Sequence, residues 1–356
     1  MKKTWMIFSI FLFAFVAFSI SSCSCPFKTY CCGESGHFEH EVTIDRIFSA
    51  AQVLEPVIRK TELHKIDGIS EQNQVYLKLE NNQLTGSFKL RGAYFMMSNL
   101  SPEEKVRGVV TCSAGNHAQG VGFAADKFDI AADIFVPSSA PEKKISALKK
   151  YKNVTLHLVE GSFDDAKAES LKFQKDKKAV FVPPFDHPNI IAGQGTIGWE
   201  IMHQLPDADV VIAAIGGGGL ISGIASAVKA LNPKCQVIGV EPANAASMYE
   251  SLRKDEIITL DSADTIADGT AVKEVGEYTF DICKHCVDKV VTVSEEEIER
   301  AIKVLKKRYD VTAEGAGALP IAALLADKIQ GENLKIVCVI SGGNIDEAKL
   351  KTILEK

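Results

Sequence analysis

The chain has 356 residues, of which 46% are hydrophobic and 24% are charged. These are ordinary values for a globular protein, and the length is enough for two domains of moderate size with a substantial core. The net charge of −6 gives no indication of binding to nucleic acid or to an anionic surface.

The N-terminus differs from the rest of the chain. Two lysines precede the apolar run Trp5–Ile20, whose length lies between a signal-peptide core of about 7–15 residues and the roughly 20 residues that span a bilayer. The following "ISSC" resembles a bacterial lipoprotein cleavage site, with Cys23 as the lipid-bearing residue. Residues 1–22 are therefore interpreted as an export or lipoprotein leader, as an uncleaved membrane anchor, or as a start codon assigned too early. In the last case the protein would be cytoplasmic.

The cysteines form two groups. One group lies beside the leader, in a linker predicted over residues 23–37, and the other is scattered through the body: Cys23, Cys25, Cys31 and Cys32, then Cys112, Cys235, Cys283, Cys286 and Cys338. Most of the second group sit in apolar runs, where a free cysteine behaves as a small hydrophobic residue. The pair in "CKHC" has metal-like spacing but no second pair, so a zinc site is not expected.

Strand-like and helix-like segments alternate along the body. Apolar runs predict eight strands: Val75–Glu80, Gly108–Cys112, Ala132–Pro137, Val154–Val159, Ala179–Pro183, Asp209–Ile215, Cys235–Glu241 and Lys335–Ile340. Helical patterns include Ile190–Gln204, Leu220–Leu231 and Ser294–Tyr309, the last with a capping serine and an acidic first turn. This alternation predicts α/β layers built around parallel sheets.

Lys89, in the stretch "TGSFKLRGAY", occupies an unusual place. It lies at the start of a predicted helix, where the partial positive charge of the helix dipole disfavours a cation. A solvated surface lysine is the simplest explanation, and a lysine used for chemistry is the alternative.

Three glycine-containing loops follow predicted strands: Cys112–Gly120, Gly216–Leu220 and Ser341–Asn344. Ligands of open α/β sheets bind beyond the carboxyl ends of the strands, so these loops predict one convergent site. The tetraglycine Gly216–Gly219 would expose backbone N–H groups at a helix N-terminus, which makes an anion cradle. Because neither the Lys-Ser/Thr of a nucleotide P-loop nor a GxGxxG fingerprint is present, the phosphate of another cofactor fits better.

Seven stretches carry a family resemblance, in this order: "ENNQLTGSFKLRGA", "SAGNHAQGV", "AGQGTIGWEI", "GGGGLISGIA", "EPANA", "TIADG" and "ISGGN". Over about residues 38–356 the chain resembles the fold-type II pyridoxal-phosphate enzymes, and within them the threonine ammonia-lyases and serine racemases. The resemblance implies a two-domain α/β fold like that of the tryptophan synthase β chain, with pyridoxal 5′-phosphate between the domains and a homo-oligomeric state. The large domain would comprise residues 38–95 and 185–356, and the small domain residues 96–184.

The resemblance also implies roles for individual residues. Lys89 would bind the cofactor covalently through its aldehyde and then act as a base, with a pKa lowered by burial and nearby positive charge. Phe88 would pack against the pyridine ring, Asn116 would contact the 3′-oxygen, Ser341 would face the pyridine nitrogen, and the phosphate would be held by Gly216, Gly217, Gly218, Gly219 and Leu220.

The implied reaction is β-elimination on L-threonine or L-serine, which yields 2-oxobutanoate or pyruvate and ammonia. A neutral Ser341 makes a weaker electron sink than an aspartate would, and this favours elimination. The loop Ser113–His117, including the Ser113 hydroxyl, would bind the substrate carboxylate, and His117 is interpreted as structuring the loop. Racemases of the family have a serine where this chain has Ala114, which has no proton to give. A serine racemase is therefore the alternative.

A cation site is the least defined expectation. Metal-binding relatives use a glutamate, a backbone carbonyl and an aspartate, which correspond here to Glu241, Ala245 and Ser247. A hydroxyl is a poor divalent ligand beside a carboxylate, so a monovalent or weakly held divalent ion is expected, or a carboxylate satisfied by local donors.

Two further expectations concern the whole chain. The sequence ends one short helix after "SGGN", so we expect no C-terminal regulatory domain and no isoleucine inhibition through one. The leader raises a different hypothesis, an exported lipoprotein that binds a small ligand without catalysis. Lys89 distinguishes the two, since a binding protein needs no lysine that reacts with a cofactor.

Overall fold

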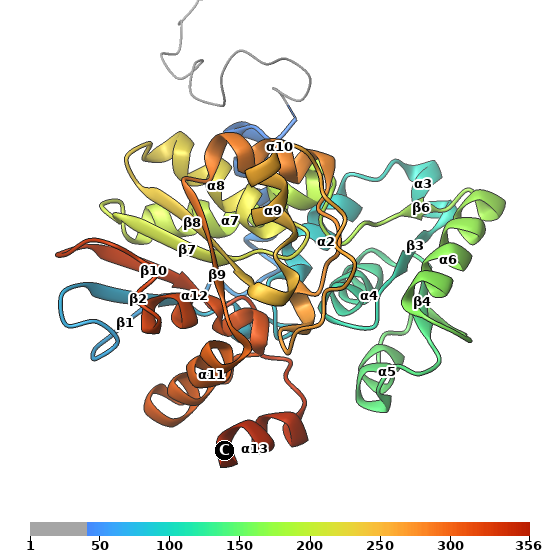
Figure 1. Ribbon diagram of the computed structural model, residues 1–356. Helices are drawn as coiled ribbons and strands as arrows, with labels where there is room; N and C mark the ends of the chain where they lie inside the picture. Colours follow the sequence, from blue (N-terminus) through green and yellow to red (C-terminus); the bar gives the residue numbers. More distant parts are fainter. Residues whose placement is uncertain (1–40) are drawn as a thin grey trace, which may run out of the picture. The chain divides into compact units, whose positions relative to one another are not determined.

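The computed structural model describes residues 41–356 (Figure 1). The predictions for the leader over residues 1–22 and for the linker over residues 23–37 lie outside this range. No helix within the described residues is both long enough and apolar enough to cross a membrane.

The body contains two sheets. The larger has the order β1-β2-β10-β7-β8-β9 and comprises β1 (Leu63–Ile66), β2 (Gln74–Lys78), β7 (Val210–Ala214), β8 (Gln236–Pro242), β9 (Lys289–Val293) and β10 (Lys335–Val339). The smaller has the order β5-β4-β3-β6 and comprises β3 (Val109–Cys112), β4 (Ala132–Pro137), β5 (Val154–Val159) and β6 (Val180–Phe181). All neighbours pair in parallel except β1 and β2. The predicted α/β fold with parallel sheets is therefore confirmed, with one antiparallel edge strand.

Helices connect and cover these strands. They are α1 (Ile44–Leu54), α2 (Lys89–Ser98), α3 (Pro102–Arg107), α4 (Asn116–Phe128), α5 (Glu142–Lys149), α6 (Phe163–Lys177), α7 (Pro188–Gln204), α8 (Gly219–Leu231), α9 (Ser247–Lys254), α10 (Glu277–Cys286), α11 (Glu295–Tyr309), α12 (Gly315–Leu325) and α13 (Glu347–Glu355), with short 3₁₀ turns at Glu80–Asn82 (η1), Ala243–Ala245 (η2) and Asp268–Thr270 (η3).

The larger sheet is buried on both faces. In β7, Val210 and Ile212 belong to the core shared with α11 and α12. Val211 and Ala213 belong to the opposite core, shared with α7, α8 and α10. A strand covered on both faces must be apolar throughout, which is why the sequence shows continuous apolar runs here.

The smaller sheet is also covered on both faces. Ala118 of α4 and Leu148 of α5 pack against Ile134 and Val136 on one side, and Ala166 of α6 packs on the other (Figure 1). All four strands of this sheet lie within residues 96–184, and all six strands of the larger sheet lie outside that range. This distribution agrees with the proposed domains, whose boundaries stay a prediction.

Sequence patterns missed two strands, β1 and β9. Both are edge strands of the larger sheet, and their sequences LHKI and KVVTV are short and partly polar. An edge strand keeps one side near solvent, so the long apolar run that marks a central strand is absent.

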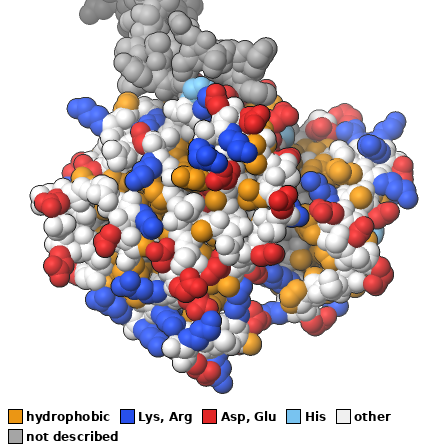
Figure 2. Space-filling model, viewed as in Figure 1, with side chains coloured by type: hydrophobic (Ala, Val, Ile, Leu, Met, Phe, Trp, Pro, Cys, Tyr) orange, Lys and Arg blue, Asp and Glu red, His pale blue; other side chains and the backbone are white. Residues whose placement is uncertain are grey.

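On the face shown in Figure 2, acidic and basic side chains are interspersed, with a group of basic side chains over α11. The last turn of α11 contains Lys306, Lys307 and Arg308. These side chains bind Asp310, the Leu354 carbonyl and the Gly68 carbonyl respectively. Lys307 and Arg308 therefore tie α11 to α13 and to the loop after β1, whereas Lys306 pairs with the C-cap of α11 itself.

Candidate functional site

Lys89 is the first residue of α2 and lies beside the loop that follows β10. Ser87 forms an isolated antiparallel bridge with Gly342. The Phe88 N–H donates to the Ser341 carbonyl at 3.1 Å. The segment before Lys89 and one of the three predicted loops, which lie far apart in the sequence, therefore run side by side. Ser341 is only 2% exposed.

The Lys89 ammonium faces neutral partners. Its Nζ donates to the Pro184 carbonyl at 2.6 Å and lies 5.3 Å from the centre of the Phe88 ring. Burial lowers the pKa of Lys89 to about 8, against the opposing effect of the Glu314 carboxylate. This environment makes a neutral amine accessible near physiological pH, as a nucleophile or base requires.

A buried ion network fixes α2 from behind. Arg91 donates to both oxygens of Glu80 at 2.8 Å, to Glu200 at 2.6 and 3.1 Å, and to the Thr196 hydroxyl at 3.0 Å. Lys78 Nζ joins Glu200 at 2.6 Å. All five guanidinium N–H groups can therefore be paired, and the helix that begins at Lys89 is anchored to β2, η1 and α7.

The tetraglycine connects β7 to α8. Gly218 has a φ of +92°, a conformation that other residues rarely adopt. A side chain at Gly217 would collide with the Phe185 ring, and one at Gly218 would lie 2.6 Å from Cβ of Thr279. Thr279 Oγ1 also donates to the Gly217 carbonyl at 2.7 Å. Within residues 41–356 no side chain caps α8, so its first N–H groups remain available to an anion.

Phe185 links this cradle to Lys89, because it directly follows the Pro184 carbonyl that accepts the Lys89 hydrogen bond. Sequence reasoning missed both residues. They follow a predicted strand, as ligand-binding loops do, but the stretch "PPFDHP" contains no glycine and so gave no sign of an anion site.

The loop after β3 leads into α4, the third predicted element of the site. The Ser113 hydroxyl accepts from the Gly115 N–H at 3.2 Å, and Gly115 caps α4 without a side-chain contact. A Cβ at Gly120 would lie 3.0 Å from the backbone of Lys89, so α4 packs directly on α2. The open N-terminus of α4 suits a carboxylate.

His117 is buried and lies with Nε2 2.9 Å from the Val182 carbonyl. Burial and the nearby Lys89 charge lower its pKa to about 3. A neutral imidazole therefore donates to the carbonyl across the small sheet. This geometry agrees with the interpretation of His117 as a residue that structures the loop.

Asn116 lies between two residues that come from the far end of the chain. Its Nδ2 donates to Glu314 Oε1 at 2.6 Å, and its Oδ1 accepts from Asn344 Nδ2 at 2.7 Å. Burial raises the pKa of Glu314 to about 7. The sequence analysis missed Glu314, because an acidic residue just before a helix is common at helix N-termini and Glu314 directly precedes α12.

Ala114 is half-buried and packs against the core cluster that contains Ala118 and Ile134. Ser87 Oγ is buried and has no hydrogen-bond partner among residues 41–356. Three features of the described residues suit a cofactor that carries an aldehyde and a phosphate. Within these residues, the Lys89 amine has no salt-bridge partner, the tetraglycine has no side-chain cap, and the Ser87 hydroxyl has no hydrogen-bond partner. The residues present therefore fit pyridoxal phosphate.

The predicted cation ligands lie at the start of α9. Both carboxylate oxygens of Glu241 accept backbone N–H groups, from Met248 at 2.9 Å and Tyr249 at 2.8 Å. Burial raises the pKa of Glu241 to about 8. Ser247 Oγ is buried without a partner in the described part of the chain, and Ala245 is buried. These two backbone donors agree with the alternative that local groups satisfy the Glu241 carboxylate. The cation site stays a prediction.

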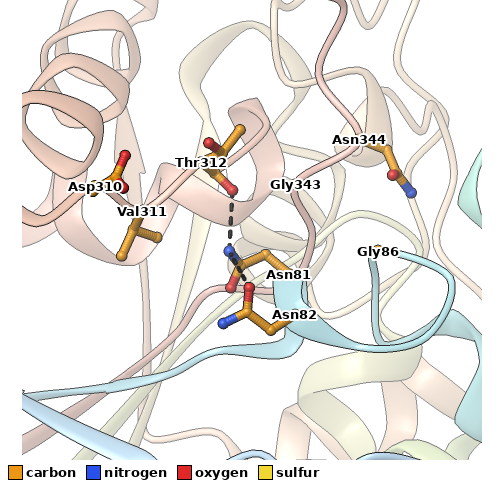
Figure 3. Close-up of a pocket in the computed structure, with 8 residues that line it drawn as sticks. All are labelled: Asn81, Asn82, Gly86, Asp310, Val311, Thr312, Gly343 and Asn344. Carbon is orange, nitrogen blue, oxygen red and sulfur yellow. Dashed lines mark hydrogen bonds between the residues drawn. The ribbon is translucent and has the colours of Figure 1, made fainter.

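A polar cavity of about 210 Å³ adjoins the loop after β10 (Figure 3). Gly86, Gly343 and Asn344 line one part of it, and the Asn81 side chain donates to the Thr312 carbonyl at 3.1 Å in another. Asn344 thus borders this cavity and also contacts Asn116.

Comparison with known proteins adds independent information. A family model described as pyridoxal-phosphate dependent enzyme matches residues 54–342. An L-threonine ammonia-lyase of Thermotoga maritima is 47% identical over 319 residues, which are 88% of this chain and 79% of that protein. Maize serine racemase has a TM-score of 0.84 at 34% identity, covering 89% of this chain and 98% of that one. The processed form of threonine deaminase isoform 2 from Solanum lycopersicum has a TM-score of 0.81 at 38% identity, covering 91% of this chain and 90% of that one.

Proposed function

This chain belongs to the family of pyridoxal-phosphate-dependent enzymes, and on that premise we propose that it is a lyase acting on L-threonine or L-serine. It removes the β-hydroxyl and the amino group, so that threonine gives 2-oxobutanoate and ammonia, and serine gives pyruvate and ammonia. The family consists of enzymes, which leaves the hypothesis of a non-catalytic ligand-binding lipoprotein without support.

One observation carries the proposal: the Lys89 amine and the tetraglycine cradle meet at Pro184 and Phe185. A reactive amine and a phosphate site joined through two consecutive residues suit a cofactor that carries both an aldehyde and a phosphate. When bound, pyridoxal phosphate would supply an electron sink for negative charge at the substrate Cα.

The chain's own residues would then divide the work. Lys89 Nζ takes the proton from Cα, since its lowered pKa makes the neutral amine available. The N–H groups at the start of α4, with Ser113, bind the substrate carboxylate. Phe88 would pack on the cofactor ring, Asn116 would contact its 3′-oxygen, Ser341 would face its nitrogen, and the backbone of Gly216–Leu220 would hold its phosphate.

Serine racemase is the second candidate, favoured by the similarity to the maize enzyme. Racemisation needs a proton donor on the face of Cα opposite Lys89. Ala114 offers only a methyl group, so elimination is the better-supported reaction.

The test uses the purified full chain loaded with pyridoxal phosphate. Wild type should convert L-threonine to 2-oxobutanoate and ammonia in equal amounts, and Lys89→Ala should lose this activity together with covalent cofactor. The exposed Lys172 provides the control, and Lys172→Ala should behave as wild type. Full turnover by Lys89→Ala would overturn the proposal.

We also propose a weak cation site at Glu241, Ala245 and Ser247. The orphaned Ser247 hydroxyl beside a buried carboxyl supports it. An unchanged melting temperature on addition of K⁺, Mg²⁺ or Ca²⁺ would count against the site.

For the leader we propose membrane association, on the basis of the Trp5–Ile20 run and Cys23. Fractionation of the full chain tests this, and recovery of the intact chain in the soluble fraction would refute it.

A further inference from the structure

We propose that Glu314 is a positioning residue that acts through Asn116: its carboxylate holds the Asn116 amide so that the remaining N–H points at the cofactor 3′-oxygen. This inference rests on the proposed function, since it assigns a residue to the same site. Glu314 would not touch the substrate.

The geometry of the Asn116 amide supports this role. One N–H of Nδ2 is taken by Glu314 Oε1 at 2.6 Å, and Oδ1 is taken by Asn344 Nδ2 at 2.7 Å. Asn344 Nδ2 also donates to the Thr85 carbonyl at 2.9 Å. No second acceptor for Asn116 Nδ2 is seen among residues 41–356, which leaves one N–H for a bound cofactor.

The charge of Glu314 and the Asn344 amide together decide which way the Asn116 amide turns. An ionised carboxylate can only accept hydrogen bonds, so it requires the NH₂ end of Asn116 to face it. A protonated carboxyl can also donate, and it then tolerates the amide in either orientation. The carboxylate also forms the stronger, charge-assisted hydrogen bond. Asn344 holds the amide from the other side, so removing the charge should loosen the orientation without abolishing it.

Among residues 41–356, the Glu314 side chain makes no hydrogen bond other than the one to Asn116. The backbone N–H of Glu314 donates to the Gly342 carbonyl at 3.0 Å, and its carbonyl accepts from Ala318. The side chain makes no capping bond to α12. The loop after β10 is therefore tied to α12 through the backbone, and a change of side chain should leave that contact intact.

Several charged groups act on the Glu314 carboxyl. Burial raises its pKa to about 7, the Asn116 hydrogen bond and the charges of Lys144 and Lys89 lower it, and Asp268 raises it. A carboxyl with this raised pKa loses its negative charge as the pH falls through about 7. His117 does not titrate in this range, because its pKa is about 3.

The experiment compares wild type, Glu314→Gln and Glu314→Asp as holoenzymes, after thermal melts have confirmed that each is folded. The visible absorption spectrum of the bound cofactor is recorded from pH 5.5 to 9, and kcat and KM for L-threonine are measured over the same range. Glu104→Gln is the matched control, because Glu104 is a half-buried glutamate of α3 that accepts a backbone N–H from Ser101 at 2.9 Å.

Glu314→Gln should lose about 5- to 10-fold in kcat/KM, because the Gln oxygen can still accept from Asn116 and only the charge assistance of that hydrogen bond is lost. The loss should fall mainly in kcat, and the ionisation near pH 7 should disappear from both the spectrum and the rate profile. Glu314→Asp should keep the ionisation, and Glu104→Gln should match wild type.

A Glu314→Gln enzyme with the wild-type spectrum and pH profile would overturn the inference, and so would an equal loss in Glu104→Gln. If wild type itself binds the cofactor but does not convert L-threonine, the proposed function fails instead. The spectral titration of Glu314→Gln would still test the positioning role in that case.

Discussion

At the scale of a single residue, Ala114 decides between elimination and racemisation in the proposed reaction. Inversion at Cα needs a proton from the face that Lys89 does not cover, and the Ala114 methyl group cannot provide one. Its side chain packs instead against the core between α4, α5 and β4. A hydroxyl at this position would have to turn away from that apolar cluster toward the site.

Ala114→Ser should therefore raise the ratio of D-serine to pyruvate formed from L-serine. We expect a several-fold rise, well short of the roughly 10²- to 10⁴-fold that a fully positioned acid or base contributes, because no partner is provided to activate the new hydroxyl. Chiral analysis of the recovered serine, run beside a pyruvate assay, measures the ratio. If wild type already racemises as fast as it eliminates, serine racemase becomes the better-supported function.

At the scale of the secondary-structure element, α2 depends on charges buried behind it. Arg91 and Glu80 are fully buried, and the Glu200 side chain is only 13% exposed. These groups join α2 to η1 and α7, so they fix both the start of α2 and the direction of Lys89. A buried pair of this kind adds little net stability over apolar packing, but removing one partner leaves an uncompensated charge.

Arg91→Met should lower the free energy of unfolding by about 3–5 kcal/mol, because it leaves two carboxylates buried without their main partner. Urea denaturation followed by circular dichroism measures the change. Lys152→Met serves as the comparison, since it breaks the exposed pair with Asp129 and should change stability by about 0–1 kcal/mol. A similar small effect for Arg91→Met would mean that the network does not hold α2.

At the scale of the whole molecule, the candidate site draws on both sheets. Asn116 follows a strand of the smaller sheet, whereas Gly216–Gly219 and Ser341 follow strands of the larger one. The direct charge pairs between α5 and the C-terminal part of the chain, Lys143–Glu347 and Lys144–Asp268, are exposed and add little. A cofactor bound between the sheets would therefore add to the coupling that the packing of α4 on α2 already provides.

Removal of pyridoxal phosphate should lower the melting temperature, and its return should restore it in a concentration-dependent way. A ligand at 100 times its Kd stabilises the native state by about 2.7 kcal/mol, which corresponds to a shift of roughly 4 °C for a chain of this size. Calorimetry of the apo and reconstituted protein tests this. A melting temperature that does not respond to the cofactor would show that the folded chain does not bind it in preference to the unfolded chain.

The sequence alone was enough to predict the central strands and the glycine-containing loops and to single out Lys89. These features are local: a strand buried on both faces must be apolar, and a loop that exposes backbone N–H groups needs glycine. The family resemblance rests on the same stretches. The edge strands β1 and β9 escaped notice because their burial, and so their pattern, is incomplete.

Tertiary structure decided the contacts that no local pattern encodes. Pro184 meets Lys89 across 95 positions in the chain, and Glu314 meets Asn116 across 198. A carboxyl before a helix looks the same in sequence whether it caps that helix or turns toward another strand end. Only the packing of the two sheets brings Glu314 to Asn116 and buries it enough to raise its pKa, because burial and hydrogen-bond partners are properties of the folded neighbourhood.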